Sequence, residues 1–597
     1  MTTSLGTQDF DEFFAAVNDG HSPFPWQRRF LSEVVDRLSD PDRGHTYWPS
    51  VVDLPTGSGK TSLIDIAVFL LAMEASRPLH ERRMPRRILF VVDRRVVVDQ
   101  ANQHAQAVAK ALADPSPSSL VIARVAEALR SYSAGTDDLP PPLVATLLRG
   151  GIVRDESWAR RPDVPTIISS TVDQVGSRLL FRGYGLSDSM RPIHAGLLGS
   201  DTLFLLDEVH LSQPFAQTLR VLATNYQRDW ADRLVPARWE VVELSATPRP
   251  DSGESSEVFG LSAQCGDFEP EDNETLFRRL SALKPVTFPE PVKISGTDKA
   301  KTTLTFATAC AIQAKELLKN EGIRTIAVVV NRVDTAVAVH RVLSEKKIAA
   351  TLLTGRMRPH DRERILNEEL KDRLRTGHPR DASQEPLVVV ATQCIEAGAD
   401  FDFDAMVSEC ASIDALVQRF GRVDRDGQLA QQGTPARSIV LVRSSDLKED
   451  SKGCLCNPDP VYGHALAETW KSLSSAEAID FGIRAFPAEL KGQPQLRATA
   501  LDAPLLFPGH LDAWVQTSPM PTPDPDPKFW LHGPDDSVSD VTVVWRSGLT
   551  EALLREAQGK DDNDDVVVAL RTLLVAAPPG ALEAMSVPLN AVRKWLR

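Results

Sequence analysis

The sequence predicts an α/β protein with two successive units of alternating strands and helices, followed by a C-terminal accessory part. In RRILFVVDRRVVVDQ (86–100), an apolar run is followed by polar residues and a new helix pattern, which is typical of a parallel sheet covered by helices. The same order returns in RTIAVVVNRVDTAVAVHRVL (324–343). We expect a first unit at residues 1–255, a polar Pro/Glu-rich linker at 256–300, a second unit at 301–445 and an accessory domain at 446–597.

Composition excludes several classes of protein. The net charge of −14 over 597 residues argues against a chain that holds nucleic acid through overall basicity, so any such binding must be local. The six cysteines show no disulfide framework, which fits a reducing cytoplasm. The N-terminus lacks the features of a signal peptide, and no apolar run approaches the ~20 residues that span a bilayer.

The stretch VVDLPTGSGKT, Val51 to Thr61, predicts a phosphate-binding loop between a strand and a helix. Small residues in such a loop let backbone N–H groups and the helix N-terminus face phosphate oxygens. Lys60 is expected to reach the outer phosphates of ATP, and the Thr61 hydroxyl to hold Mg²⁺. Leu54 replaces the first Gly of the usual pattern. The remaining expected contacts are Thr56, Gly57, Ser58 and Gly59.

The words SPFPWQRRF, upstream of this loop, have two compatible interpretations. Phe24 or Trp26 is placed to stack on an adenine, with the Gln27 amide bonding its edge. Alternatively, Trp26 and Phe30, at i and i+4, form the core face of an opening helix.

Two adjacent carboxylates follow a strand in DTLFLLDEVHLSQPF (201–215). Asp207 is suited to hold Mg²⁺ through water, and Glu208 to polarise the attacking water. His210 is expected on the γ-phosphate side. A solvated acidic turn is the alternative.

Arginines placed after strands are candidates for phosphate contacts. Arg94 and Arg95 follow a predicted strand and are interpreted as contacts to a nucleic-acid backbone, although a solvated face is the alternative. In QRFGRVDR, the spacing of Gln418, Arg422 and Arg425 at i, i+4 and i+7 predicts one shared face. Such arginines stabilise a triphosphate during transfer, and the competing interpretation is an ion pair with Asp424 or Asp426.

Taken together, the ordered motifs from Phe24 to Ser444 resemble those of superfamily 2 helicases. They are PWQ, PTGSGKT, VDRR, SSTVDQ, DEVH, SAT, VVNR, LTGRM, ATQCIEAGADFDFD and QRFGRVDR. The resemblance implies two RecA-like domains, with ATP in the cleft between them and single-stranded DNA across both. It assigns nucleotide contacts to Gly398 and Asp400, and coupling to His210, Ser245 and Thr247. It assigns DNA contacts to Arg94, Arg95, Thr171, Asn331, Arg332, Thr354, Gly355, Arg356, Thr392 and Gln393.

Within this superfamily, the wording of DEVH, TQCIEAGADFDFD and QRFGRVDRDG resembles the CRISPR-associated helicase of type I systems. STVDQVGSRLLFRGYG and HAGLL resemble its type I-G branch. The resemblance implies a DNA motor recruited by the Cascade complex. Family members commonly carry a His-Asp nuclease domain, but the only adjacent His-Asp pair is His360-Asp361, inside the second unit, so we expect the nuclease on a separate polypeptide or beyond this chain.

The C-terminal part is the least informative. A Pro-rich spacer (517–528) precedes one predicted strand (539–548) and two helices, and the pattern does not decide whether they close over the DNA or dock on a partner. Besides a DNA motor, a generic repair or RNA helicase and a nucleotide-gated interaction module that does not unwind DNA remain open.

Overall fold

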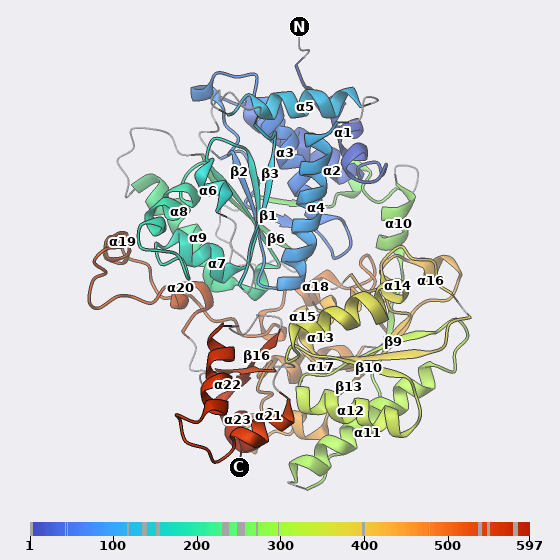
Figure 1. Cartoon of the computed structure of the whole chain (residues 1–597). Coiled ribbons are helices and arrows are strands. Elements are labelled where there is room, and N and C mark those ends of the chain that lie inside the picture. The colour runs from blue at the N-terminus through green and yellow to red at the C-terminus, as the bar shows by residue number, and fades with distance from the viewer. Residues whose placement is uncertain are drawn as a thin grey trace.

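The structure, a computed structural model, shows two α/β domains stacked on one another, with the chain end beside the second (Figure 1). It describes residues 4–41, 43, 46–115, 119–133, 140–150, 156–229, 238–246, 257–269, 273–296, 298–381, 383–396, 400–476, 478–534, 540–545, 550–576 and 583–596. None of the helices in these ranges is long and apolar enough to cross a membrane.

The first domain is organised around a parallel sheet that has seven strands in the described part of the chain. Its order is β3-β4-β2-β5-β6-β1-β7, so the strand before the phosphate loop lies inside the sheet. The strands are β1 (Val51–Asp53), β2 (Arg87–Val91), β3 (Val144–Leu148), β4 (Thr166–Ser170), β5 (Thr202–Asp207), β6 (Trp239–Ser245) and β7 (Val258–Gly260).

Both faces of this sheet are buried, because alternate residues of its strands enter two different cores. In β2, Ile88 and Phe90 belong to one core, and Leu89 and Val91 to the other. The first core is covered by α1 (Phe10–Val17), α2 (Pro25–Ser39), α3 (Leu63–Glu74), α4 (Arg95–Ala113) and α5 (Leu120–Arg130). The second is covered by α6 (Ser157–Arg160), α7 (Val172–Leu179), α8 (Met190–Leu198) and α9 (Gln213–Val221).

The second domain repeats this plan. Its sheet, in the described residues, has the order β10-β11-β9-β12-β13-β8-β14, and only the short β14 pairs antiparallel. The strands are β8 (Pro285–Thr287), β9 (Thr325–Val329), β10 (Ala350–Leu353), β11 (Leu387–Ala391), β12 (Ala405–Glu409), β13 (Arg437–Leu441) and β14 (Ile479–Asp480). The helices are α11 (Lys299–Leu317), α12 (Val333–Glu345), α13 (Pro359–Arg364), α14 (Lys371–Leu374), α15 (Ile413–Phe420) and α16 (Gln428–Gln431).

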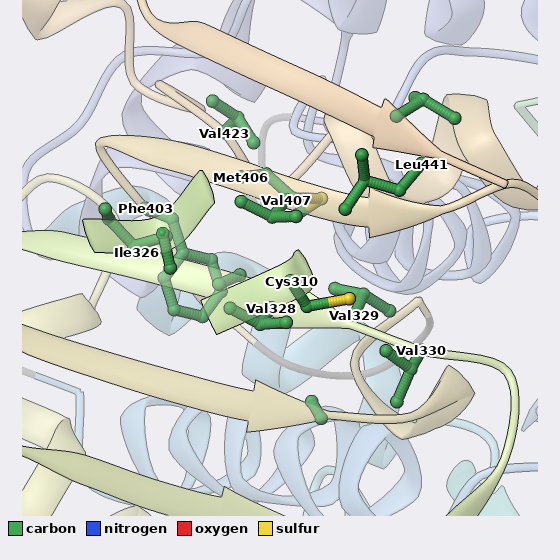
Figure 2. Packing of buried hydrophobic residues seen from close by; sticks show 14 of the residues in the cluster. Cys310, Ile326, Val328, Val329, Val330, Phe403, Met406, Val407, Val423 and Leu441 are labelled. Atoms are coloured by element: carbon green, nitrogen blue, oxygen red, sulfur yellow. The ribbon is translucent and has the colours of Figure 1, made fainter. Parts of the chain in front are cut away.

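Branched side chains of neighbouring strands form the core of the second domain. Figure 2 shows Val328 of β9 near Val407 of β12, with Cys310 of α11 over the sheet. β-branched residues fit this doubly covered position well. Two parallel sheets covered by helices confirm the expected α/β class with tandem RecA-like domains.

The stretch expected as a linker carries elements of both domains. β7 pairs with β1, and β8 pairs with β13, so each sheet receives one strand from it. Between them, α10 (Glu274–Ser281) buries Leu276 and Leu280 in the first domain's core.

The region expected as one accessory domain is distributed over three places. α17 (Ala465–Ser474), β14 and α18 (Ala488–Lys491) complete the second domain, with Trp470 in its core. α19 (Pro508–Val515) and α20 (Lys528–His532) return to the first domain, where α20 lies against α7 and α9 (Figure 1). Trp530 of α20 is buried in the core there. The last described part is a two-stranded antiparallel sheet of β15 (Asp540–Val544) and β16 (Ala584–Pro588), with the helices α21 (Glu551–Ala557), α22 (Asp565–Ala576) and α23 (Leu589–Leu596).

His194 of α8 makes the stability of the first domain depend on pH. Its ring is 1% exposed, lies edge-on to Trp158 and has no hydrogen-bond partner within the described residues. Burial, with Arg178 nearby, lowers the pKa of His194 to about 4. The unfolded chain takes up this proton near pH 6.5, so the free energy of unfolding should fall between pH 6.5 and 4, by up to about 3 kcal/mol.

The measurement is urea unfolding of the wild type and His194→Phe at pH 7.5 and 5.0. We expect the variant, which cannot titrate, to lose less stability on acidification. Equal losses in both proteins would show that His194 does not contribute.

Candidate nucleotide site between the two domains

The phosphate loop is shaped by glycines and supported by α2. Gly57 and Gly59 both have positive φ, +87° and +85°, which L side chains rarely adopt. The Trp26 indole donates from Nε1 to Ser58 O at 3.0 Å, and the Trp26 side chain is fully buried. The core interpretation of Trp26 is therefore right, and this core residue also fixes the loop.

The Gln27 amide lies against the loop, and both of its ends are engaged. Its Oε1 accepts from Phe24 N at 2.7 Å, and its Nε2 donates to Ser62 Oγ at 2.5 Å. A Cβ on Gly59 would come within 3.3 Å of this amide and 3.4 Å of the Phe24 ring. Adenine recognition by Phe24 and Gln27 remains a prediction, because it requires the Gln27 amide to exchange partners.

Asp207 and Glu208 lie where β5 ends, facing Lys60. The Lys60 Nζ is 3.8 Å from Glu208 Oε1. Burial, with repulsion from Glu208, raises the pKa of Asp207 to about 7. Burial also acts to raise the pKa of Glu208, but the positive charges of Lys60 and the nearby arginines outweigh it and hold this pKa below its ordinary value.

Three buried polar atoms of this group have no hydrogen-bond partner in the described residues. They are Lys60 Nζ, Asp207 Oδ1 and Glu208 Oε2. Buried groups of this kind are costly unless a ligand satisfies them. A cationic amine beside two carboxylate oxygens matches a phosphate with a divalent cation, so the residues present fit ATP and Mg²⁺.

His210 joins the two domains through Gln418. The Gln418 amide donates from Nε2 to His210 Nε2 at 2.8 Å. His210 Nδ1 lies 3.5 Å from Glu208 Oε2. Burial lowers the pKa of His210, which favours the neutral ring, and the Gln418 Nε2 group lies within reach of both ring nitrogens, 2.8 Å from Nε2 and 3.2 Å from Nδ1. This chain of contacts connects α15 of the second domain to the carboxylates of the first.

Arg422 and Arg425 lie beyond the end of α15, in a turn, and both line the same cleft as Lys60. A Cβ on Gly57 would be 3.5 Å from Arg425 Nε. Arg422 donates from Nη2 to Glu396 O at 2.8 Å, and Arg425 pairs with Asp400 at 3.2 Å. Burial lowers the pKa of Arg422 to about 9.

Asp424 and Asp426, the alternative ion-pair partners of Arg422 and Arg425, bind other arginines. Asp424 is held by Arg380 at 3.2 Å, and Asp426 by Arg278 and Arg279 of α10. Arg422 and Arg425 thus remain directed at the cleft, whose volume is about 1500 Å³.

Comparisons with known proteins match one family model in each domain. A family model described as "CRISPR-associated nuclease/helicase Cas3, C-terminal" matches residues 323–428, and one described as "Type III restriction enzyme, res subunit" matches residues 20–131. A Cas3 nuclease/helicase of Methanothermobacter thermautotrophicus is 28% identical over 131 residues, which are 22% of this chain and 15% of that protein. A Cas3 helicase of Thermoproteus tenax is 35% identical over 121 residues, 20% of each chain.

Solved structures show the same fold. T. fusca Cas3 with AMPPNP superimposes with a TM-score of 0.58 at 16% identity, over 98% of this chain and 66% of that chain. The T. fusca Cas3-ATP structure gives 0.54 at 15%, over 97% and 65%. The chain resembles Cas3 proteins in fold and, over a part of its length, in sequence. It spans slightly less than two thirds of those Cas3 chains.

In this Cas3-like core, the residues predicted to contact nucleic acid are distributed unevenly. Arg95 and Gly355 line the cleft, and Arg356 is exposed. Thr171, Thr354 and Thr392 are buried at the ends of strands, and Arg94 precedes α4. Arg332 pairs with Asp459, and Gln393 donates to Asn331 O at 2.9 Å.

Asn331 is internal, since its side chain donates to Cys410 O and accepts from Arg419. Its main chain is engaged as well, since Asn331 N donates to Glu409 Oε2 at 2.8 Å and Asn331 O accepts from Gln393 Nε2. Ser245 is buried where β6 ends, and its carbonyl accepts from Leu54 N at 3.1 Å. Thr247 and Gly398 lie outside the described residues.

Sequence reasoning missed three arginines that organise the site. Arg419 is fully buried and donates to Glu396, Ser408 and Tyr462. Arg380 holds Asp402, which accepts from Arg425 N at 2.7 Å. Arg419 lies inside the QRFGRVDR motif, so the motif could have indicated that this arginine belongs to the site. No pattern marked Arg380 or Arg279.

Proposed function

We propose that this chain is an ATP-dependent single-stranded DNA translocase and helicase of a type I CRISPR system, which unwinds target DNA after recruitment by Cascade. One observation carries the proposal. Lys60, Asp207 and Glu208 of one domain and Gln418, Arg422 and Arg425 of the other are directed at the same buried place between two RecA-like sheets. ATP bound there would be enclosed only when the two domains are together.

Each side chain has a distinct task in hydrolysis. Lys60 neutralises the outer phosphates, and Arg425 stabilises charge that develops on the transferred phosphoryl group. Glu208, whose pKa stays low, accepts the proton of the attacking water. Thr61 and Asp207 would hold Mg²⁺, which supplies charge neutralisation across the phosphate oxygens. A cation held there would favour the ionised form of Asp207, whose pKa is raised first by burial and then by the charge of Glu208.

The contact between His210 and Gln418 offers a path from hydrolysis to movement. The His210 ring lies between Glu208 and Gln418, so a change at the γ-phosphate alters the surface that α15 rests on. Release of this contact would let the second domain move away and rebind farther along the strand. The net charge of −14 means that the strand must follow local cationic groups such as Arg95 and Arg362 rather than the overall surface.

Cascade and a separate His-Asp nuclease subunit are the proposed partners. The resemblance to Cas3 proteins supports Cascade as a partner, and the nuclease lies either on a separate polypeptide or in a part of the protein beyond the given sequence. Among the described residues, there is no group of three or more His, Cys, Asp or Glu side chains that would hold a metal. In the His360-Asp361 pair, the Asp361 carboxylate is already bound by Arg358 in a bidentate ion pair, with an Nη2–Oδ1 distance of 2.8 Å.

ATP turnover with different nucleic acids tests the substrate class. We expect single-stranded DNA to raise the turnover rate severalfold more than RNA of the same sequence, with a steep decrease at higher salt. Stronger stimulation by RNA would favour an RNA helicase. Turnover that no nucleic acid changes would favour a nucleotide-gated interaction module.

A further inference from the structure

Helix α10, between the two domains, places two adjacent arginines beside the nucleotide site. The helix is anchored in the first domain, because Leu276 and Leu280 are each 1% exposed within its core. Its N-terminus is capped by Asn273, whose Oδ1 accepts from Leu276 N at 2.9 Å. The arginines Arg278 and Arg279, in the last turn of α10, point out of this core toward the second domain.

Both arginines bind Asp426, the residue directly after Arg425. Arg278 donates from Nη2 to Asp426 Oδ2 at 2.6 Å and from Nε to Asp426 O at 2.6 Å. Arg279 donates from Nε to Asp426 Oδ1 at 2.9 Å. The Asp426 side chain is 3% exposed, and its Oδ2 also accepts from Gln428 Nε2 at 3.4 Å. Buried charge-assisted bonds of this length are among the stronger ones in proteins.

Only Arg279 also contacts the phosphate loop. Its Nη1 donates to Gly57 O at 3.1 Å, and Gly57 has the positive φ of +87° that gives the loop its shape. A single planar guanidinium therefore touches the loop that carries Lys60 and the turn that carries Arg425. Arg278 makes no contact with the loop that the structure records, although it binds the same carboxylate.

The fit between α10 and the turn depends on Gly427. A Cβ on Gly427 would lie 2.5 Å from Arg278 O, and its φ is +71°. A side chain would thus push the turn away from the end of α10. This close approach holds Asp426 at the position where both arginines reach it.

We propose that Arg279 is a positioning residue that fixes the phosphate loop only while the turn at 421–427 is docked. With Asp426 in place, the Arg279 guanidinium is held through its Nε, and its Nη1 group orients the Gly57 carbonyl. When the second domain moves away, Arg279 loses its carboxylate and the loop loses its support. Nucleotide then has to order the loop on binding, which weakens affinity. Domain closure and ATP affinity are linked through this side chain.

This inference rests on the proposed function, and the neighbouring arginine supplies a matched control. We compare Arg279→Met with Arg278→Met in the full chain, measuring ATP turnover with saturating single-stranded DNA and the thermal midpoint. Each variant loses one ion pair to Asp426, and only Arg279→Met loses the loop contact. We expect Arg279→Met to raise KM for ATP about tenfold with kcat lowered less than threefold, and Arg278→Met to change both less than threefold.

Two further variants keep the test decisive if Arg279→Met destabilises the protein. Arg279→Lys retains a charge for Asp426 but cannot bond both partners at once, so it should keep the thermal midpoint and show most of the KM increase. Asp426→Asn should raise KM as well, and adding Arg279→Met to it should have little further effect.

Equal KM values in Arg278→Met and Arg279→Met, or a wild-type KM in Arg279→Lys, would overturn the inference. Absence of ATP turnover in the wild type would instead contradict the proposed function. The two failures are therefore distinguishable.

Discussion

Replacing Lys60 by Ala is expected to lower ATP turnover by about a thousandfold, the scale seen when one preorganised charge-stabilising group is removed. Lys60 Nζ is buried with no hydrogen-bond partner in the described chain and lies 3.8 Å from Glu208 Oε1. In a phosphate loop of this kind, the lysine neutralises the outer phosphates of the nucleotide. The measurement is steady-state phosphate release with saturating single-stranded DNA.

Lys371→Ala serves as the control, because Lys371 lines the same cleft on an exposed part of α14. It should keep turnover within about threefold, since an exposed amine contributes little to a buried site. The thermal midpoint of Lys60→Ala should fall modestly, because the variant leaves the buried Asp207 and Glu208 without the positive charge that offsets their burial. Turnover close to the wild-type rate in Lys60→Ala would exclude this loop as the catalytic site.

Replacing Arg425 by Ala is expected to lower kcat by about a thousandfold or more, the range reported for arginines that complete a phosphoryl-transfer site. Arg425 comes from the second domain, yet its Nε would be 3.5 Å from a Cβ on Gly57 of the first. Because this charge acts on the transition state, KM for ATP should change far less than kcat. Rapid-quench measurement of a single turnover separates the chemical step from product release.

Arg425→Lys should not restore the rate, since a point charge lacks the planar fork of a guanidinium. Arg375→Ala, also on the cleft wall of the second domain, is the matched control and should leave kcat nearly unchanged. If Arg425→Ala retained the kcat of the control, the second domain would have no direct part in hydrolysis. The site would then belong to the first domain alone.

Local patterns predicted the parts of this site that lie at ends of strands. Continuous apolar runs such as LFLL before Asp207 indicate a strand buried on both faces, and the residue type that follows indicates the chemistry. The α/β class and the positions of Lys60 and Asp207 follow from such runs, whereas Arg425 was predicted from its spacing with Gln418 and Arg422. Strand order does not, because β8 has only three residues and lies in a stretch that reads as a polar linker.

Contacts between segments that are far apart in the sequence could not be predicted, because no local pattern marks them. Arg279 and Gly57 are 222 positions apart, and Arg182 and Asp524 are 342 apart. Neither pair has a periodicity or a motif. The same reason explains why the C-terminal region was hard to interpret. Its helices have short apolar patterns, and their burial is decided by two different domains.

The most direct test of a motor that closes around ATP is strand displacement. The substrate is duplex DNA with a single-stranded 3′ tail, supplied with ATP and Mg²⁺, and the release of the labelled strand is followed for the wild type and Arg425→Ala. We expect the wild type to release the strand in proportion to ATP hydrolysed, and the variant to release none above the level without ATP. Rapid hydrolysis by the wild type without any strand release or movement on single-stranded DNA would contradict the proposal.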